Sequence, residues 1–148
     1  MEHYLITHGH QHLGCNSGHN DAGFAQLDNL ILPDDVTRVI VGTGQRFEEM
    51  LLRFYQRGKL STNLPRYFSP FCGGPEAFDT PDEIILVTGT RICLEAEYIG
   101  MDNHWGFNPQ GFIRSQPDNA LFLTGSELMQ ALHVDRPAHG ALYCLLTQ

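Results

Sequence analysis

Short apolar runs alternate with helical patterns along this chain, and that alternation limits the folds open to it more than any other feature. The runs expected to be strands are nearly continuously apolar or β-branched and end at glycine or polar residues: 4–7, 38–41, 84–88, 120–123 and 141–146. Helical spacing of apolar residues follows most of them, at 21–30, 45–58, 92–99 and 126–132. Strands buried on both faces and joined through helices favour parallel pairing by right-handed crossovers. We therefore expect an α/β fold with a mostly parallel central sheet and helices on both faces.

The helix expected at 21–30 has a clear start signal. Asn20 is a favourable N-cap, Asp21 places a carboxylate at the positive end of the helix, and the helix should close before Pro33. By contrast, 59–83 and 102–117 contain prolines and glycines without a regular apolar period. We assign these two segments no helix or strand.

Composition narrows the class of protein. A chain of 148 residues is one domain by size, here 1–148. Its 17 acidic and 9 basic residues give a net charge of −8 without a basic stripe, so we expect no nucleic-acid partner. There is no basic-then-apolar leader and no apolar run of about 18 residues, so we expect neither a signal peptide nor a membrane span. Cys93 and Cys144 lie in apolar runs expected in the core, and no Cys-x-x-Cys pair occurs, which suits a reducing, cytoplasmic compartment.

The first strand runs directly into a cluster of histidines, Thr7-His8-Gly9-His10-Gln11-His12. The carboxyl end of a strand in an open α/β sheet is the usual position of groups that handle ligands. His8 is therefore the first candidate for a functional side chain.

Three short motifs follow one another along the chain. They are Thr7-His8-Gly9 after the first expected strand, Asn20-x-x-Gly23-x-x-Gln26-Leu27 at the first expected helix, and Gly42-Thr43-Gly44-Gln45-Arg46 after the second expected strand. Together they resemble the histidine phosphatase superfamily, the phosphoglycerate-mutase-like proteins. That family has Arg-His-Gly, then Leu-Thr-x-x-Gly-x-x-Gln-Ala, then Ser-Ser-Pro-Leu-x-Arg-Ala, and Val-Ser-His-Gly after a later strand. The resemblance covers mainly 4–51 and more faintly 84–91. It implies a phosphoglycerate-mutase-like three-layer sandwich and phosphoester hydrolysis through a phosphohistidine, without a metal ion or other cofactor.

The resemblance also implies roles for individual residues. His8 would be the nucleophile, with one ring nitrogen held as N–H by a backbone carbonyl near Gly9. Arg46 would bind the phosphoryl oxygens. Further site residues on this basis are Asn16 and Thr43 as donors and Glu76 as a candidate general acid. The partner would be a small phosphorylated molecule or a phosphoprotein, and the oligomeric state is left open.

The chain departs from the family pattern at two places. Thr7 stands where the family has its first arginine, leaving one hydroxyl as a substrate-binding group. The strand at 84–88 is followed by Gly89, where the family has its second histidine, and Arg91 is a candidate to restore positive charge there. Alternatively, His139-Gly140 is a displaced His-Gly pair, although it precedes a strand and not a helix. Two lost donors would leave a weak enzyme.

The expected arrangement places the strands at 4–7, 38–42 and 84–88 side by side and parallel, so that His8, Thr43 and Gly89 approach one another. Two other functions stay open. One is a catalytically inactive domain of the same fold that binds a phosphate-bearing ligand or a protein. The other is a zinc-dependent hydrolase, because His8, His10 and His12 resemble the Thr-His-x-His-x-Asp-His loop of the metallo-β-lactamase group without its Asp.

Overall fold

The computed structural model describes residues 2–9, 11–13, 18–42, 44–69, 83–85, 91–93, 97–98, 109–125 and 138–146. Within these, the main sheet has 6 strands in the order β6-β3-β2-β7-β1-β8. Its strands are β1 (Glu2–Thr7), β2 (Arg38–Gly42), β3 (Arg66–Ser69), β6 (Glu97–Tyr98), β7 (Ala120–Thr124) and β8 (Leu142–Leu146). All neighbouring pairs are parallel except β1 and β8, so the prediction of a mostly parallel sheet is confirmed.

The strand predicted to lie beside β1 and β2 is not in this sheet, and that part of the expected arrangement is wrong. Instead β7 separates β1 from β2, pairing Thr7 with Thr124 and Val41 with Leu123. The run at 84–88 contributes β4 (Glu83–Ile85), which pairs antiparallel with β5 (Arg91–Cys93) in a separate 2-stranded sheet. A short apolar run fits a core strand and a hairpin strand equally well, because periodicity does not reveal the pairing partner.

Local structure departs from the sequence-based expectation at three further places. The helix expected at 92–99 is wrong, since β5 and β6 lie there. In the segment left unassigned at 59–83, β3 extends the sheet with the sequence Arg-Tyr-Phe-Ser. In the segment left unassigned at 102–117, α4 (Pro109–Arg114) begins at a proline, which is favoured at the first helical position. The helix expected at 126–132 lies outside the described residues.

The two helices on the amino-terminal half form as predicted. In α1 (Asp21–Asp28), the Asn20 side chain caps the helix by accepting from the N–H of Gly23 at 2.9 Å. His19, just before the cap, lies against Phe24 with ring centroids 5.4 Å apart, a contact of the hydrophobic-staple kind. The longer α2 (Gln45–Gln56) has Gly44 as its N-cap residue, and the φ of 148° at this position suits glycine.

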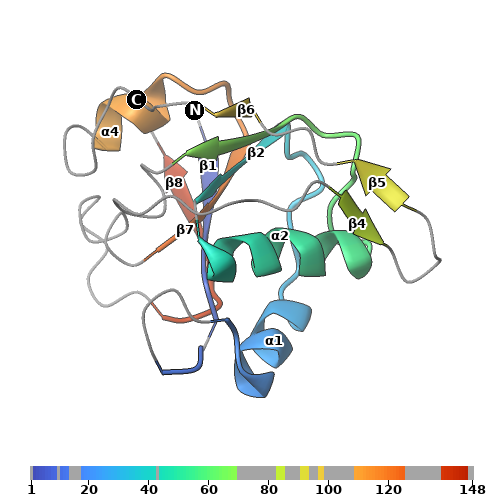
Figure 1. Ribbon diagram of the computed structural model, residues 1–148. Helices are drawn as coiled ribbons and strands as arrows, with labels where there is room; N and C mark the ends of the chain where they lie inside the picture. The colour runs from blue at the N-terminus through green and yellow to red at the C-terminus, as the bar shows by residue number, and fades with distance from the viewer. Residues whose placement is uncertain are drawn as a thin grey trace.

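Side chains alternate between the two faces of the sheet and build a core on each. One face, covered by α1 and α2, buries the larger cluster, which includes Tyr4, Ile6, Val39, Val41, Phe47, Phe54 and Leu123. The other face buries Leu5, Ile40, Phe112, Ile113, Ala120 and Phe122 against α4. Helices therefore cover both faces, as predicted, and Figure 1 shows α1 and α2 on one side of the strands and α4 on the other.

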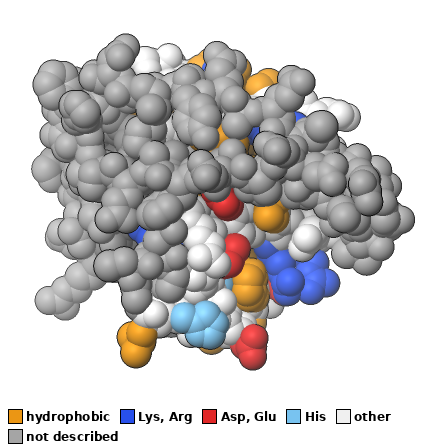
Figure 2. Space-filling view, in the orientation of Figure 1, with side chains coloured by type: hydrophobic (Ala, Val, Ile, Leu, Met, Phe, Trp, Pro, Cys, Tyr) orange, Lys and Arg blue, Asp and Glu red, His pale blue; other side chains and the backbone are white. Residues whose placement is uncertain are grey.

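The surface carries both signs of charge in the described part of the chain. At the carboxyl end of α2, Arg53 holds Asp28 of α1 with two hydrogen bonds of 2.8 and 2.7 Å, which lower the pKa of Asp28. In Figure 2 blue Lys and Arg side chains gather at the lower right of the face in view.

The prediction that Cys144 is a core residue is wrong, because its side chain is exposed on β8. No described helix combines the length and the apolar character that crossing a membrane requires.

Candidate functional site

The candidate site lies where β1 and β7 end side by side. His8 directly follows β1 and is only 9% exposed. The neighbouring strand β7 ends in Thr124-Gly125, so the strand end beside His8 carries no histidine. The second histidine was expected from sequence at Gly89, which is outside the described residues, and the strand beside β1 is β7.

The tautomer of His8 follows from one hydrogen bond. Its Nδ1 lies 2.9 Å from the carbonyl oxygen of Gly9, and a carbonyl can only accept, so Nδ1 carries the proton. Nε2 is then the nitrogen with a free lone pair when the ring is neutral. Burial lowers the pKa of His8 to about 4, against the opposing effect of the Gly9 hydrogen bond, so the ring is neutral near pH 7. The predicted carbonyl partner near Gly9 is confirmed.

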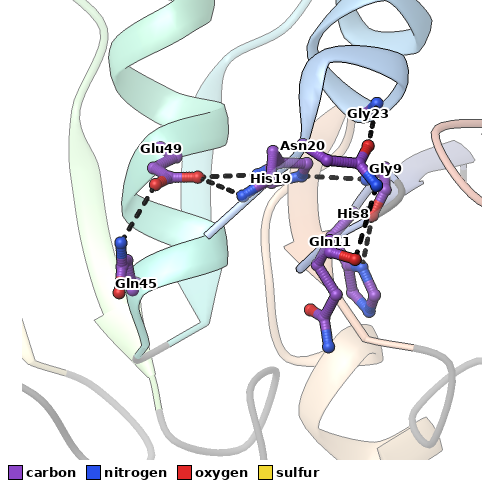
Figure 3. Close-up of polar contacts among 8 residues, drawn as sticks. All are labelled: His8, Gly9, Gln11, His19, Asn20, Gly23, Gln45 and Glu49. Atoms are coloured by element: carbon purple, nitrogen blue, oxygen red, sulfur yellow. Dashed lines mark hydrogen bonds and ion pairs between the residues drawn. The ribbon is translucent and has the colours of Figure 1, made fainter. Parts of the chain in front are cut away.

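A second buried histidine, His19, forms a hydrogen bond with the backbone that follows His8. His19 is 4% exposed, and its Nε2 accepts from the backbone N–H of Gly9 at 2.9 Å. Its Nδ1 therefore carries the proton and donates to Oε1 of Glu49 at 3.0 Å. The same oxygen accepts from the backbone N–H of His19 at 2.7 Å. Figure 3 shows the resulting series from Glu49 on α2, through His19, to Gly9 and His8.

Gly9 must be glycine for a separate, steric reason. A Cβ built on Gly9 would lie 2.6 Å from the carbonyl oxygen of Gly23 and 2.8 Å from its Cα. Both contacts are with backbone, which cannot rotate away. The close approach of Gly9 to the backbone of Gly23 thus sets how α1 docks against the end of β1, and it explains why glycine stands at position 9.

Arg46 lies on the same end of the sheet as His8. Its guanidinium sits 4.5 Å from the ring centroid of Phe47, and the Phe47 ring lies 6.0 Å from that of His8. The positive charge of Arg46 contributes to the lowered pKa of His8, which places the two groups in one electrostatic environment. His8 and Arg46, the two principal candidates from sequence, therefore both lie beside Phe47 at this end of the sheet.

Thr7 was expected to bind substrate through its hydroxyl, but this hydroxyl contacts the backbone of Ala138 and Ala141. Its hydroxyl donates to the carbonyl of Ala138 and accepts from the N–H of Ala141 at 3.2 Å. A hydroxyl has one proton to donate, so this contact leaves none for a ligand. The contact also holds the segment that carries His139, whose ring centroid lies 5.4 Å from that of His8. His139, the alternative histidine of the sequence analysis, is thus next to the candidate nucleophile.

The remaining sequence candidates lie beyond what the structure describes. Asn16, Thr43, Glu76, His10 and Gly89 are outside the described residues. The backbone of Arg91 is described in β5, outside the main sheet. Among the described residues, no group of His, Cys, Asp and Glu is arranged to hold a metal ion. Because a zinc site at His8, His10 and His12 would involve His10, it stays a prediction.

Sequence reasoning missed His19 and Glu49. A signal for His19 existed: it precedes the N-cap of α1, where an apolar residue usually packs against the fourth helical residue. A histidine at this place has a polar edge that needs partners once it is buried. No local pattern marks Glu49, because its partner is 30 residues away along the chain.

No protein-family model and no curated protein sequence matches the chain. Solved structures do share its fold. TTHB049 from Thermus thermophilus is 17% identical, with a TM-score of 0.57 over 98% of this chain and 92% of that one. The protein histidine phosphatase SixA, complexed with tungstate, is 13% identical, with a TM-score of 0.53 over 93% of this chain and 80% of that one. SixA from Agrobacterium tumefaciens is also 13% identical, with a TM-score of 0.53 over 97% of this chain and 89% of that one.

Proposed function

We propose that this chain, whose fold is that of the histidine phosphatases, is a phosphohydrolase-like protein that acts through a phosphohistidine at His8. The observation that carries the proposal is the state of His8: a buried, neutral imidazole at a strand end, with Nδ1–H held by the Gly9 carbonyl. A neutral ring with a fixed tautomer presents the lone pair of Nε2, which phosphoryl transfer to nitrogen requires. The substrate is a small phosphoester or a phosphoprotein.

The reaction has two steps. Nε2 of His8 attacks phosphorus, so a P–N bond forms while the P–O bond to the leaving group breaks. The leaving oxygen takes a proton from a general acid, for which Glu76 is the sequence candidate. A water oxygen then attacks the phosphohistidine and passes a proton to the carboxylate left by the first step, the P–N bond breaks, and phosphate leaves with His8 and the general acid restored. Arg46 binds the phosphoryl oxygens and stabilises the charge that develops on them.

Two features of the site favour slow turnover. Thr7 replaces a charged donor, and its proton is already engaged by Ala138. The end of β7 supplies Thr124-Gly125 and no imidazole. Each missing donor lowers the rate by about a hundredfold or more. These observations support a second candidate function, a catalytically inactive domain that binds a phosphate-bearing ligand or a protein at the same site.

Hydrolysis of a generic aryl phosphate tests the proposal. His8→Ala removes the nucleophile and Arg46→Ala removes the binding arginine, so each should abolish hydrolysis while the circular dichroism spectrum stays unchanged. Gln56→Ala, an exposed substitution at the end of α2, is the control and should keep full activity. A chelator should leave the wild-type rate unchanged, because this chemistry needs no divalent ion.

The same variants separate an enzyme from a binding domain. If wild type hydrolyses nothing beyond His8→Ala, yet phosphate raises the melting temperature of wild type alone, the inactive binding domain is correct. If phosphate stabilises wild type and both variants equally, His8 and Arg46 share no site and both candidate functions are wrong. Stoichiometric zinc that is lost on His12→Ala would establish the zinc hydrolase instead.

A further inference from the structure

A second imidazole stands next to His8 on a segment far away in sequence. The 138–141 turn, Ala138-His139-Gly140-Ala141, precedes β8 and carries His139. The rings of His8 and His139 have centroids 5.4 Å apart and planes inclined at 48°. His139 is exposed whereas His8 is buried, so His139 forms the solvent side of this pair.

The 138–141 turn is anchored at both of its ends. The N–H of Gly140 donates to the carbonyl of His8 at 2.9 Å, and the N–H of Ala138 donates to the hydroxyl of Tyr143 at 2.8 Å. Gly140 has a φ of 59°, a left-handed conformation that glycine adopts without strain. His139 is therefore displayed from a backbone that is itself tied to His8, which is how a preorganised site residue is held.

Thr7 completes this anchoring. Its backbone N–H donates to the carbonyl of Ala141 at 3.2 Å, and its hydroxyl bonds to Ala138 and Ala141 on either side. Thr7 is 3% exposed, so a long side chain in its place would have to displace the turn. The residue that replaces the family's first arginine is thus the residue that brings the second imidazole to the site.

We propose that His139 is a substrate-binding residue, which donates a hydrogen bond to an oxygen of the phosphoryl group seated at His8. An imidazole N–H contacts an oxyanion at about 3 Å, so a phosphoryl group at His8 lies within reach of both rings. This inference rests on the proposed function of His8.

Binding of inorganic phosphate, measured by calorimetry at neutral pH, tests the role of His139. His139→Phe keeps a ring of similar size but removes both nitrogens, and it should weaken phosphate binding about tenfold, the effect of one charge-assisted hydrogen bond. His139→Gln keeps a donor and should recover part of that loss. Gln56→Ala should bind as wild type does. Melting temperatures without phosphate verify that each variant is folded.

A double-mutant cycle tests the part played by Thr7. Thr7→Val keeps the shape of the side chain but removes both hydroxyl hydrogen bonds to the turn. If Thr7 acts by placing His139, Thr7→Val should weaken phosphate binding in wild type and have little further effect in His139→Phe. Additive losses would mean that Thr7 contacts phosphate directly, and would overturn its assignment as a positioning residue.

The outcomes distinguish this inference from the proposed function. If His8→Ala and Arg46→Ala lose phosphate binding while His139→Phe keeps it, the role of His139 is wrong and the proposed function stands. If His8→Ala and Arg46→Ala bind phosphate as wild type does, or wild type binds none, the proposed function is wrong and the role of His139 is wrong with it.

Discussion

Replacing Glu49 tests whether the series of hydrogen bonds behind His8 supports the site. In Glu49→Ala, the backbone N–H and the Nδ1–H of His19 lose their shared acceptor, Oε1 of Glu49. The His19 side chain is fully buried, but that of Glu49 is 23% exposed, so water can reach one end of the contact. A buried donor without a partner costs about 1–3 kcal/mol, and allowing for that water we expect a loss of about 2–3 kcal/mol for the two donors.

The matched variant is Glu49→Gln. A glutamine carbonyl oxygen has two lone pairs and can accept both N–H groups of His19. Its amide would face the Nε2 donor of Gln45, which lies 3.2 Å from Oε2 of Glu49, so a small loss of about 0.5–1 kcal/mol is expected. Alanine and glutamine are both good helix formers, so α2 itself should be unaffected.

Urea unfolding followed by circular dichroism measures both variants against wild type. For a domain of this size, about 1 kcal/mol shifts the melting temperature by about 2–4 °C, so Glu49→Ala should melt about 5–10 °C lower. If Glu49→Ala is as stable as wild type, or if Glu49→Gln loses as much as Glu49→Ala, the hydrogen bonds to His19 do not hold the loop and the reasoning fails.

Three further predictions concern the buried histidines and Gly9. His3 is 0% exposed, and within the described part of the chain neither of its ring nitrogens has a hydrogen-bond partner. His3→Leu should therefore raise the free energy of unfolding, measured in urea, by about 1–2 kcal/mol. A loss of stability would show that the His3 ring makes hydrogen bonds in the folded protein. Burial lowers the pKa of His3 and His19, and it lowers the pKa of His8 from 6.5 to about 4. Between pH 6.5 and about 4 the unfolded chain therefore binds more protons than the folded protein does. The free energy of unfolding should fall as pH drops from 6.5 to about 4, and a flat profile over this window would contradict the burial of these rings as neutral groups. Gly9→Ala should place a Cβ against the backbone of Gly23 and lower both stability and phosphate binding, whereas a variant that melts and binds as wild type does would disprove the close approach.

Local patterns were sufficient for the parts of the fold that depend on a few neighbouring residues. The start of α1 was predictable because Asn20 caps it through its own side chain, three residues from its partner Gly23. The strands β1, β2, β7 and β8 were predictable because their apolar runs are bounded by polar or glycine residues. The position of His8 at a strand end followed from the same signals, and so did the class of fold.

The pairing of strands and the composition of the site depended on contacts between distant residues. The strand between β1 and β2 is β7, not the run at 84–88. Strand pairing depends on which residues are buried on both faces of the sheet, and a short apolar run does not contain that information by itself. His19 meets Glu49 across 30 residues, and Thr7 meets Ala138 across 131. The sequence therefore determined that His8 stands at the end of a buried strand. The packing of β7, α2 and the 138–141 turn around His8 decided which side chains surround it. These contacts join backbone and side-chain groups that approach one another only when the sheet has formed.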